Sequence, residues 1–248
     1  MSEQEPQKVH SSRMHGSGKL SFRRRVPVVD EPDLPMILGG ERPPDLRTIV
    51  PDGFQRVEIE VGPGKGAFLL AATEARPDTF HLGIEASPPY AQHAAQRLKK
   101  SRRTNGTLLI DNAKAFLKDQ VDDGELDRLH IYFPDPWPKR RHRKRRFFTA
   151  EMPAVIHRAL KPEGWLLIAT DNAALAGEIA RVVGSAPGLV RRPDEEQRLQ
   201  AGPGGHGFSP TSFERKYIEE GRTIRRFAFQ RANLDRENVP RQRVSPES

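Results

Sequence analysis

A carboxylate, an aromatic ring and a run of cations follow one another in residues 135–146, which read Asp-Pro-Trp-Pro-Lys-Arg-Arg-His-Arg-Lys-Arg-Arg. Seven of the eight residues from Lys139 to Arg146 are Lys or Arg, which is denser than solubility needs and typical of a strip that contacts a nucleic-acid backbone. The apolar residues 129–133 predict a strand, so Asp135 is expected where a strand ends and a loop begins. Ligands of open α/β sheets bind at such carboxyl ends. The segment therefore predicts an active-site acid beside a phosphate-binding surface.

Residues 60–66 form a second motif, Glu-Val-Gly-Pro-Gly-Lys-Gly, where a predicted strand turns into a predicted helix. Glycines let the backbone approach a ligand closely, and the N–H groups of a helix start suit polar or anionic groups. The spacing also fits the dinucleotide fingerprint, with Glu85 placed as a ribose-binding acid, so the glycines alone do not separate NAD from S-adenosylmethionine. Glu60 favours S-adenosylmethionine, because a carboxylate suits a sulfonium and an amino group and would repel a pyrophosphate.

Two further polar positions follow predicted strands. Asn112, with Ala113 after it, could read an adenine edge with its amide or could cap the next helix. Asp171, with Asn172 after it, could likewise enter the site or cap a helix. The residues alone leave both roles open at both positions.

Strands and helices alternate over about 130 residues from Arg56. Strands are predicted at 57–61, 79–84, 107–110, 129–133 and 164–170. Two helices are predicted to begin at residues 65 and 88, and a third is predicted to end at residue 117. Two more are predicted over 148–160 and 175–183. This alternation predicts an α/β fold with a doubly wound parallel sheet.

The remaining segments define the expected domain organisation. Residues 1–53 are rich in Pro, Ser, Gly and basic residues, and we expect a flexible N-terminal arm. Residues 54–230 are expected to form one domain, with a mobile loop at 184–210 and a final strand at 223–230. Residues 231–248 are expected to be a solvated tail.

The amino-acid composition of the chain limits the kinds of function that it could have. The chain has 41 Lys and Arg against 33 Asp and Glu, which favours a polyanionic partner, although a net charge of +8 could also serve solubility alone. No apolar run approaches the roughly 20 residues that span a bilayer, and the N-terminus lacks a signal-peptide segment, so we expect a cytoplasmic protein. With no cysteine and no paired-histidine spacing, no metal site is expected.

Together the motifs resemble the tRNA (guanine-N7-)-methyltransferases of the bacterial single-chain type. That family combines Glu-x-Gly-x-Gly-x-Gly, Asp-Pro-Trp-x-Lys-x-x-His-x-x-Arg-Arg and a late Thr-x-Phe-Glu, which are matched here by residues 60–66, 135–146 and 211–214. The resemblance covers residues 54–230. It implies a Rossmann-like class I S-adenosylmethionine-dependent methyltransferase fold and methyl transfer from S-adenosylmethionine to N7 of a guanine in tRNA. No obligatory protein partner is expected.

The resemblance also implies roles for individual residues, and Asp135 would be the catalytic carboxylate. With the glycine turn included, the methyl-donor pocket is expected to contain Glu60, Gly62, Gly64, Gly66, Glu85, Asn112, Ala113 and Asp135. The RNA substrate is expected to contact Lys139, Asp171, Thr211, Ser212, Phe213 and Glu214. The basic run itself predicts RNA-backbone contacts at Arg140, Arg141, Arg143, Lys144, Arg145 and Arg146.

The implied chemistry needs no base, because guanine N7 already presents a lone pair. Catalysis is then mainly alignment, and a carboxylate near the purine would stabilise the positive charge that moves onto it. Asp135 is the candidate, either through its field or by accepting from the guanine Watson–Crick edge, and Glu214 is a second possible reader. Trp137 could stack on the base or pack within its loop. Because A-form RNA hides N7 in a deep groove, an exposed nucleotide is expected.

Three alternatives stay open at this stage. A methyltransferase of an adenine or a glutamine amide is suggested by the likeness of Asp-Pro-Trp-Pro to a polar-Pro-Pro-aromatic loop, and it would ignore tRNA. A non-enzymatic RNA-binding protein would bind RNA with steep salt dependence and have no affinity for S-adenosylmethionine, but the complete set of glycines and acids argues against it. An NAD oxidoreductase would have no use for the basic run.

Overall fold

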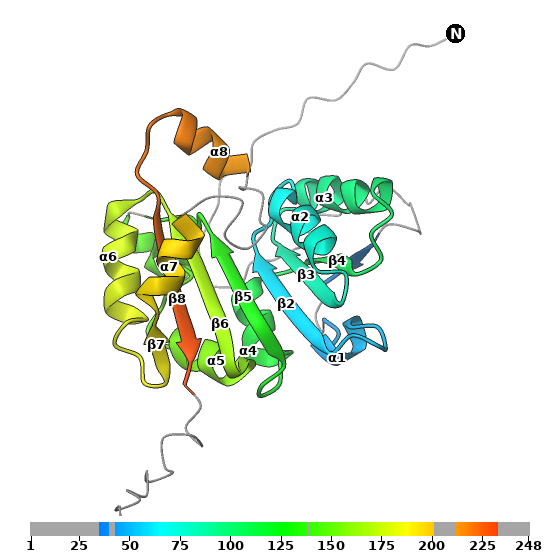
Figure 1. The fold of residues 1–248 in the computed structure, drawn as a ribbon, viewed down its shortest axis with the longest axis horizontal. Coiled ribbons are helices and arrows are strands. Elements are labelled where there is room, and N and C mark those ends of the chain that lie inside the picture. Colours follow the sequence, from blue (N-terminus) through cyan, green and yellow to red (C-terminus); the bar gives the residue numbers. More distant parts are fainter. Residues whose placement is uncertain (1–34, 40–42, 138, 201–211, 233–248) are drawn as a thin grey trace, which may run out of the picture. The chain divides into compact units, whose positions relative to one another are not determined.

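The computed structural model describes residues 35–39, 43–137, 139–200 and 212–232 (Figure 1). All of them belong to the second of two compact units, which spans residues 33–248. The strands are β1 (Met36–Leu38), β2 (Arg56–Val61), β3 (Thr79–Glu85), β4 (Gly106–Ile110), β5 (Leu126–Tyr132), β6 (Leu160–Thr170), β7 (Leu189–Arg191) and β8 (Arg225–Arg231). The helices are α1 (Leu46–Ile49), α2 (Ala67–Ala75), α3 (Pro88–Lys100), α4 (Ala113–Asp119), the 3₁₀ helix η1 (Arg140–Arg145), α5 (Met152–Ala159), α6 (Ala173–Val182), α7 (Pro193–Gln200) and α8 (Ser212–Glu219).

The strands form one sheet in the order β1-β4-β3-β2-β5-β6-β8-β7. The pairs from β1 to β6 are parallel, whereas β8 is antiparallel to both β6 and β7. The predicted α/β Rossmann-like fold is confirmed, with a mixed edge in place of an all-parallel sheet. The chain runs outward from β2 through β3 and β4, then crosses to β5 on the other side of β2. A ligand crevice is expected at this switch point, outside the carboxyl ends of β2 and β5.

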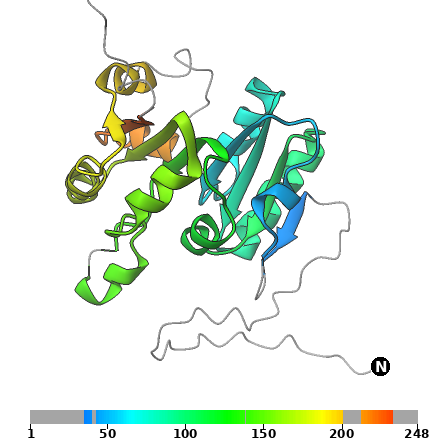
Figure 2. The same ribbon diagram turned by 90° about the horizontal axis from the view of Figure 1, so that it is seen from below.

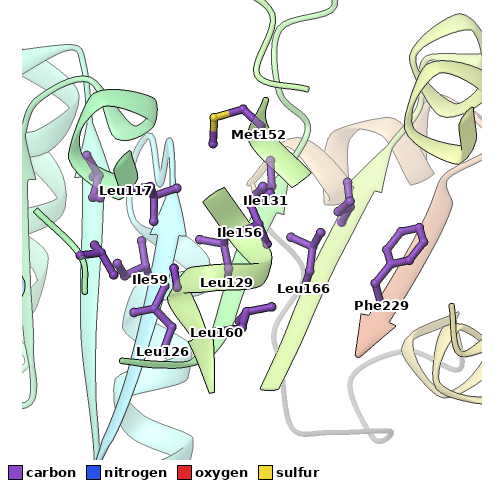
Figure 3. Packing of buried hydrophobic residues seen from close by; sticks show 14 of the residues in the cluster. Ile59, Leu117, Leu126, Leu129, Ile131, Met152, Ile156, Leu160, Leu166 and Phe229 are labelled. Carbon is purple, nitrogen blue, oxygen red and sulfur yellow. The ribbon is translucent and has the colours of Figure 1, made fainter. Parts of the chain in front are cut away.

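Helices bury apolar side chains on both faces of the sheet. In β4, Leu108 and Ile110 join the cluster under α2 and α3, whereas Leu109 between them joins the larger cluster on the opposite face, as the two-residue period of a strand requires. Figure 3 shows this larger cluster, in which Met152 and Ile156 of α5 lie over the side chains of β2 and β5. The sheet is therefore covered on both faces, as a parallel sheet requires.

Two expected boundaries are corrected. The segment 1–53 was expected to lie outside the domain, but Met36 pairs with Leu108 in the sheet, and Leu46 and Ile49 are buried in the core. These apolar residues stand between prolines, and each makes its contacts with distant parts of the chain. Residues 1–34 and 233–248, including most of the expected arm and tail, lie outside the described residues.

The segment 184–210 is not a loop throughout, because it contains β7 and α7. Glu196 in α7 is only 6% exposed and accepts two hydrogen bonds from Arg191, at 2.8 and 2.9 Å, and one from the backbone N–H of Ala228 in β8. A polar helix is therefore attached to the sheet edge through one buried carboxylate. Residues 201–211 lie outside the described part. Among the helices that are described, none is both long enough and apolar enough to cross a bilayer.

Candidate active site

The turn after β2 has the backbone geometry that its glycines predict. Gly62, Gly64 and Gly66 have φ values of 67°, 55° and 68°, in the left-handed region that favours glycine. A Cβ on Gly66 would lie 2.7 Å from the Cβ of Ala94, so this glycine also lets the start of α2 pack against α3. A Cβ on Gly62 would meet no described atom within 4 Å. The turn is therefore closed on the side of Gly66 and open on the side of Gly62.

Glu85 is held between this turn and the start of α3. Its Oε2 accepts from the backbone N–H of Gly64 at 3.0 Å, and its Oε1 accepts from the backbone N–H of Ser87 at 2.8 Å. The residue is only 8% exposed. Each carboxylate oxygen keeps a second lone pair, so the fixed carboxylate can still accept from the hydroxyl groups of a ribose.

Glu60 is the second acid at this end of the sheet, and it has very different surroundings. The residue is 4% exposed, and among the described residues its Oε2 has no hydrogen-bond partner. Burial and the charge of Glu85 raise the pKa of Glu60 to about 8, with a backbone N–H of Leu69 acting in the opposite direction. A buried acceptor without a donor is costly, and a cationic ligand group would satisfy it. These residues fit a donor with an ammonium group and a ribose, as S-adenosylmethionine has.

Asn112 caps α4. Its Oδ1 accepts from the backbone N–H groups of Lys114 at 3.0 Å and Ala115 at 3.4 Å, and Ala113 is the partly buried first residue of the helix. The side-chain NH₂ is the part of Asn112 that remains for a ligand. Asn172 caps α6 in the same way, by accepting from the backbone N–H of Leu175 at 2.9 Å. Of the two neighbouring polar residues there, Asp171 is therefore the one directed to other contacts.

Asp135 is exposed and lies in the loop that leaves the carboxyl end of β5, as expected. Two residues that are not glycine, Phe133 and Trp137, have positive φ values of 52° and 40° on either side of it. Such conformations are costly and persist where the surroundings impose them. The backbone N–H of Phe133 donates to the carbonyl of Ala169 in β6 at 2.8 Å, which ties the start of the loop to the sheet.

Trp137 packs within its own loop. The His142 ring meets it edge-on with 5.4 Å between centroids, and the Arg145 guanidinium lies 4.9 Å from the indole centroid. Arg146 donates to the Trp137 carbonyl from Nε and Nη2, at 3.2 and 3.1 Å. These contacts support the packing role of Trp137.

The basic run is not uniform. Lys139, Arg141 and Arg145 are exposed, and the green segment around η1 extends away from the strands in Figure 2. Arg146 is different, because its Nη1 lies 2.8 Å from Oε2 of Glu178 in α6, in addition to its bonds to Trp137. The guanidinium of Arg146 therefore fastens the loop to the domain, and its expected contact with the RNA backbone stays a prediction. The side chains of Arg140, Arg143 and Lys144 are not among those described.

The late motif lies partly in α8, on the side of the sheet where the arrowheads of β5 and β6 point (Figure 1). Thr211 lies outside the described residues, and Ser212 and Phe213 are described by their backbone alone. Glu214 is paired with Arg226 in β8. Asp171 is paired through Oδ2 with Nη1 of Arg222 at 2.8 Å. Both acids expected to contact RNA therefore already have a cationic partner.

A buried chain of polar groups beneath the pocket was missed at the sequence level. Glu58 Oε2 accepts from Arg76 Nη2 at 2.6 Å and from His130 Nε2 at 2.8 Å, and His130 Nδ1 lies 2.9 Å from the Tyr132 hydroxyl. Burial opposes ionisation of Glu58, but the hydrogen bond from His130 and the charges around it lower its pKa to about 2. Burial lowers the pKa of His130, so we assign a neutral ring that donates to Glu58 and accepts from Tyr132. The available signal was polar residues at every second position of strands that are otherwise apolar.

The strand order of this mixed sheet, with antiparallel β8 between β6 and β7 at one edge and a glycine turn after β2, is typical of the class I methyltransferase fold. The chain matches the family model described as "Putative methyltransferase" over residues 55–227. The tRNA (guanine-N(7)-)-methyltransferase of Nitrosomonas europaea is 30% identical over 223 residues, which cover 89% of this chain and 91% of that protein. This chain belongs to the tRNA (guanine-N7-)-methyltransferase family.

Three further comparisons support less, because two cover only part of the chains and one concerns the fold alone. The tRNA (guanine-N(7)-)-methyltransferase of Rhodopirellula baltica is 42% identical over 122 residues, which cover 47% of this chain and 45% of that protein. The match to the protein of the same name from Xanthomonas axonopodis pv. citri covers 56% of its length, so this chain spans about half of each of these two relatives. The crystal structure of the 16S rRNA methyltransferase KamB has a TM-score of 0.50 at 14% identity, over 73% of this chain and 89% of that one. This likeness concerns the fold alone.

Proposed function

We propose that this chain transfers a methyl group from S-adenosylmethionine to N7 of a guanine in tRNA. The observation that carries the proposal is the meeting of two sites at one switch point of the sheet. The pocket of Glu60, the glycine turn and Glu85 lies at the ends of β2 and β3, and the Asp135 loop with its cations leaves the adjacent strand β5. Membership of the family supports both the reaction and the acceptor.

On this proposal the donor pocket binds by charge and by hydrogen bonding. Glu60, in its carboxylate form, accepts from the ammonium group of the donor, which gives the buried Oε2 a partner. Glu85, already fixed by Gly64 and Ser87, accepts from the ribose hydroxyls. The open side of Gly62 leaves room for the donor beside the turn. When bound, S-adenosylmethionine supplies a methyl group activated by its sulfonium.

The acceptor side needs orientation and electrostatic stabilisation in place of proton removal. Guanine N7 has a free lone pair, so no residue must act as a base. The exposed Asp135 carboxylate is proposed to face the guanine, where a fixed negative charge stabilises the positive charge that develops on the purine. It can also accept from the guanine N–H groups and so help to select the base.

The tRNA backbone is proposed to lie along the exposed cations of the loop. Lys139, Arg141 and Arg145 are the members of the run whose described side chains are exposed, and Arg146 holds the loop in place. Because the target atom must reach the end of β5, an unstacked nucleotide is the proposed substrate. We further propose that the enzyme acts in the cytoplasm and needs no obligatory protein partner.

The test incubates the purified chain with labelled S-adenosylmethionine and unmodified tRNA, then digests the tRNA and identifies the nucleosides by mass spectrometry. The expected product is 7-methylguanosine, lost in Asp135→Ala while the Kd for S-adenosylmethionine is kept. Asp52→Ala, at an exposed acid before β2, is the matched control and should retain activity. Donor binding without methylation of tRNA would refute the proposed acceptor, and failure to bind the donor would refute the enzyme class.

A further inference from the structure

A line of four side chains joins α8 to the loop that carries Asp135. The rings of Phe133 and Tyr217 meet edge to face, with centroids 5.3 Å apart, and the Arg222 guanidinium lies 4.5 Å from the Tyr217 centroid. Arg222 Nη1 then reaches Asp171 Oδ2 at 2.8 Å. We call Phe133, Tyr217, Arg222 and Asp171 the clasp. Its members come from the loop after β5, from α8, from the segment between α8 and β8, and from the end of β6.

The contacts of the clasp can fix the position of α8. A helix of eight residues is too short to be stable alone in water, so its position depends on tertiary contacts. Ile218 is 55% exposed and the adjacent Glu219 is also exposed, so this side of α8 does not enter the core. Tyr217 is half-buried and provides the aromatic contact between α8 and the rest of the site. The Glu214–Arg226 pair supplies a second tie, to β8.

The other end of the clasp is the strained start of the Asp135 loop. Phe133 has a φ of 52° and lies two residues before Asp135, so the packing of its ring influences the direction in which the loop leaves β5. Burial and the charge of Asp171 raise the pKa of the Tyr217 phenol, with smaller contributions from Glu220 and Asp135 and an opposing one from Arg222. The contact of its ring with Phe133 joins α8 to the loop that carries the exposed acid.

The ion pair of the clasp contributes little to global stability. The Arg222 side chain is 47% exposed, so solvent screens its charge and weakens its pair with Asp171. Arg222 shares its charge further with Glu220, at 2.7 Å. Such contacts add little to the free energy of unfolding, but they join α8 to the Asp135 loop. They are therefore suited to fixing the position of the helix.

We propose that Tyr217 and Arg222 are positioning residues, which hold α8 against the Phe133–Asp135 loop and so align the acceptor base with the methyl donor. The role rests on the methyl transfer proposed above. Asp171 then acts through its Oδ2 as the anchor of Arg222. Methyl transfer depends on the alignment of three atoms, so a shift of about 1 Å in α8 is sufficient to slow it greatly.

The test uses Tyr217→Ala, Arg222→Gln and the double variant in single-turnover methylation at saturating donor and tRNA. Each single substitution is expected to slow transfer about 10- to 100-fold. The double variant is expected to be no slower than the worse single one, because both act through one unit. The Kd for S-adenosylmethionine should stay within about twofold, because the donor pocket is formed by β2, β3 and the turn. Tyr217→Phe keeps the ring that contacts Phe133 and Arg222 and should lose less activity than Tyr217→Ala.

Glu219→Gln, at an exposed position on the same helix, is the matched control and should leave the rate unchanged. Arg222→Lys keeps the charge beside Asp171 but loses the planar group over Tyr217, so it replaces Arg222→Gln if that variant does not fold. Unchanged rates in folded variants, or losses in the double variant that equal the product of the single losses, would overturn the proposal.

A second readout separates the clasp from the reaction. Amide hydrogen exchange of residues 212–219 in the free protein should become faster in Tyr217→Ala and in Arg222→Gln and stay unchanged in Glu219→Gln. Equal exchange in all variants would refute the clasp even if the enzyme methylates tRNA. If the wild type binds the donor but does not methylate tRNA, the proposed reaction fails, and faster exchange would still establish the contact.

Discussion

Glu60 and Glu85 lie at the ends of neighbouring parallel strands, yet only Glu85 has both of its oxygens satisfied by backbone N–H groups. The charge of Glu85, added to burial, raises the pKa of Glu60 to about 8, so Glu60 is mostly protonated at pH 7. The pocket therefore contains one acid that is structurally fixed and one whose charge depends on what enters. Donor binding and proton release are expected to be linked.

Donor binding at pH 7 should release a proton from Glu60. A cationic donor favours the carboxylate form, so affinity should rise with pH between about 6 and 7.5, by at most about tenfold per unit. Calorimetry in two buffers of different ionisation enthalpy measures the released proton. Glu60→Gln should bind more weakly and release none. If Glu60→Gln released as many protons as wild type, another group would be responsible.

Glu60 should also make the stability of the free protein depend on pH. Its pKa in the folded state, about 8, lies above the value of 4.5 in the unfolded chain, so its contribution is fully present below about pH 4.5 and is lost as pH rises through about 8. Relative to wild type, Glu60→Gln should gain on the order of 3 kcal/mol in free energy of unfolding between pH 5 and pH 8. Urea unfolding at both pH values measures this difference. An equal gain in Glu219→Gln would show that the effect is not specific to the pocket.

Glu58 should be far more important for stability than for donor affinity. Glu58→Gln leaves the Arg76 guanidinium, whose side chain is 16% exposed, without its carboxylate, and the loss of one partner of a buried pair costs roughly 3–5 kcal/mol. Tyr132→Phe removes one hydrogen bond to His130 and should cost about 1 kcal/mol. Chemical denaturation measures both. The double variant Glu58→Gln with Arg76→Gln should recover part of the loss, and strict additivity would contradict the pairing.

Substitutions of the cations in the basic run should have two different effects, one on tRNA binding and one on stability. Lys139→Gln with Arg141→Gln should weaken tRNA binding and reduce the slope of log K against log salt by about 0.7–0.9 for each phosphate that is no longer neutralised. Arg146→Gln should instead lower the thermal midpoint, because it breaks the pair with Glu178. Filter binding across a salt series measures the slopes. Arg56→Gln, at an exposed cation at the start of β2, should change neither. An unchanged slope in the Lys139 and Arg141 variant would mean that the run is only solvated.

The parts of the site that local pattern could predict are those that follow from strand ends and glycines. The turn at 60–66, Glu85 and Asp135 all lie at carboxyl ends, because hydrophobic period and glycine conformation are local properties. The residues alone leave the roles of Asn112 and Asp171 open, since a cap and a ligand contact require the same residue type, and the cap of α6 is Asn172, the neighbour of Asp171.

The partners of the charged residues could not be predicted in this way. The pair of Arg146 with Glu178 spans 32 residues and that of Asp171 with Arg222 spans 51, and among the many acids and bases of this chain only tertiary packing selects them. The same holds for α7, whose polar sequence has the composition of a loop and whose attachment depends on Glu196. Likewise β1 has only three residues, too few for a periodic pattern.

Because the chain crosses from one side of β2 to the other, such an enzyme can change its nucleotide target in evolution without changing its methyl source. Apart from Asp135, the residues proposed to bind the methyl donor come from the stretch β2 to α4, whereas the Asp135 loop, the cations and the clasp come from β5 onward. The two tasks are thus encoded in consecutive stretches of the chain. Changes in the later stretch can retarget the enzyme to another nucleotide while the earlier stretch keeps the same methyl source.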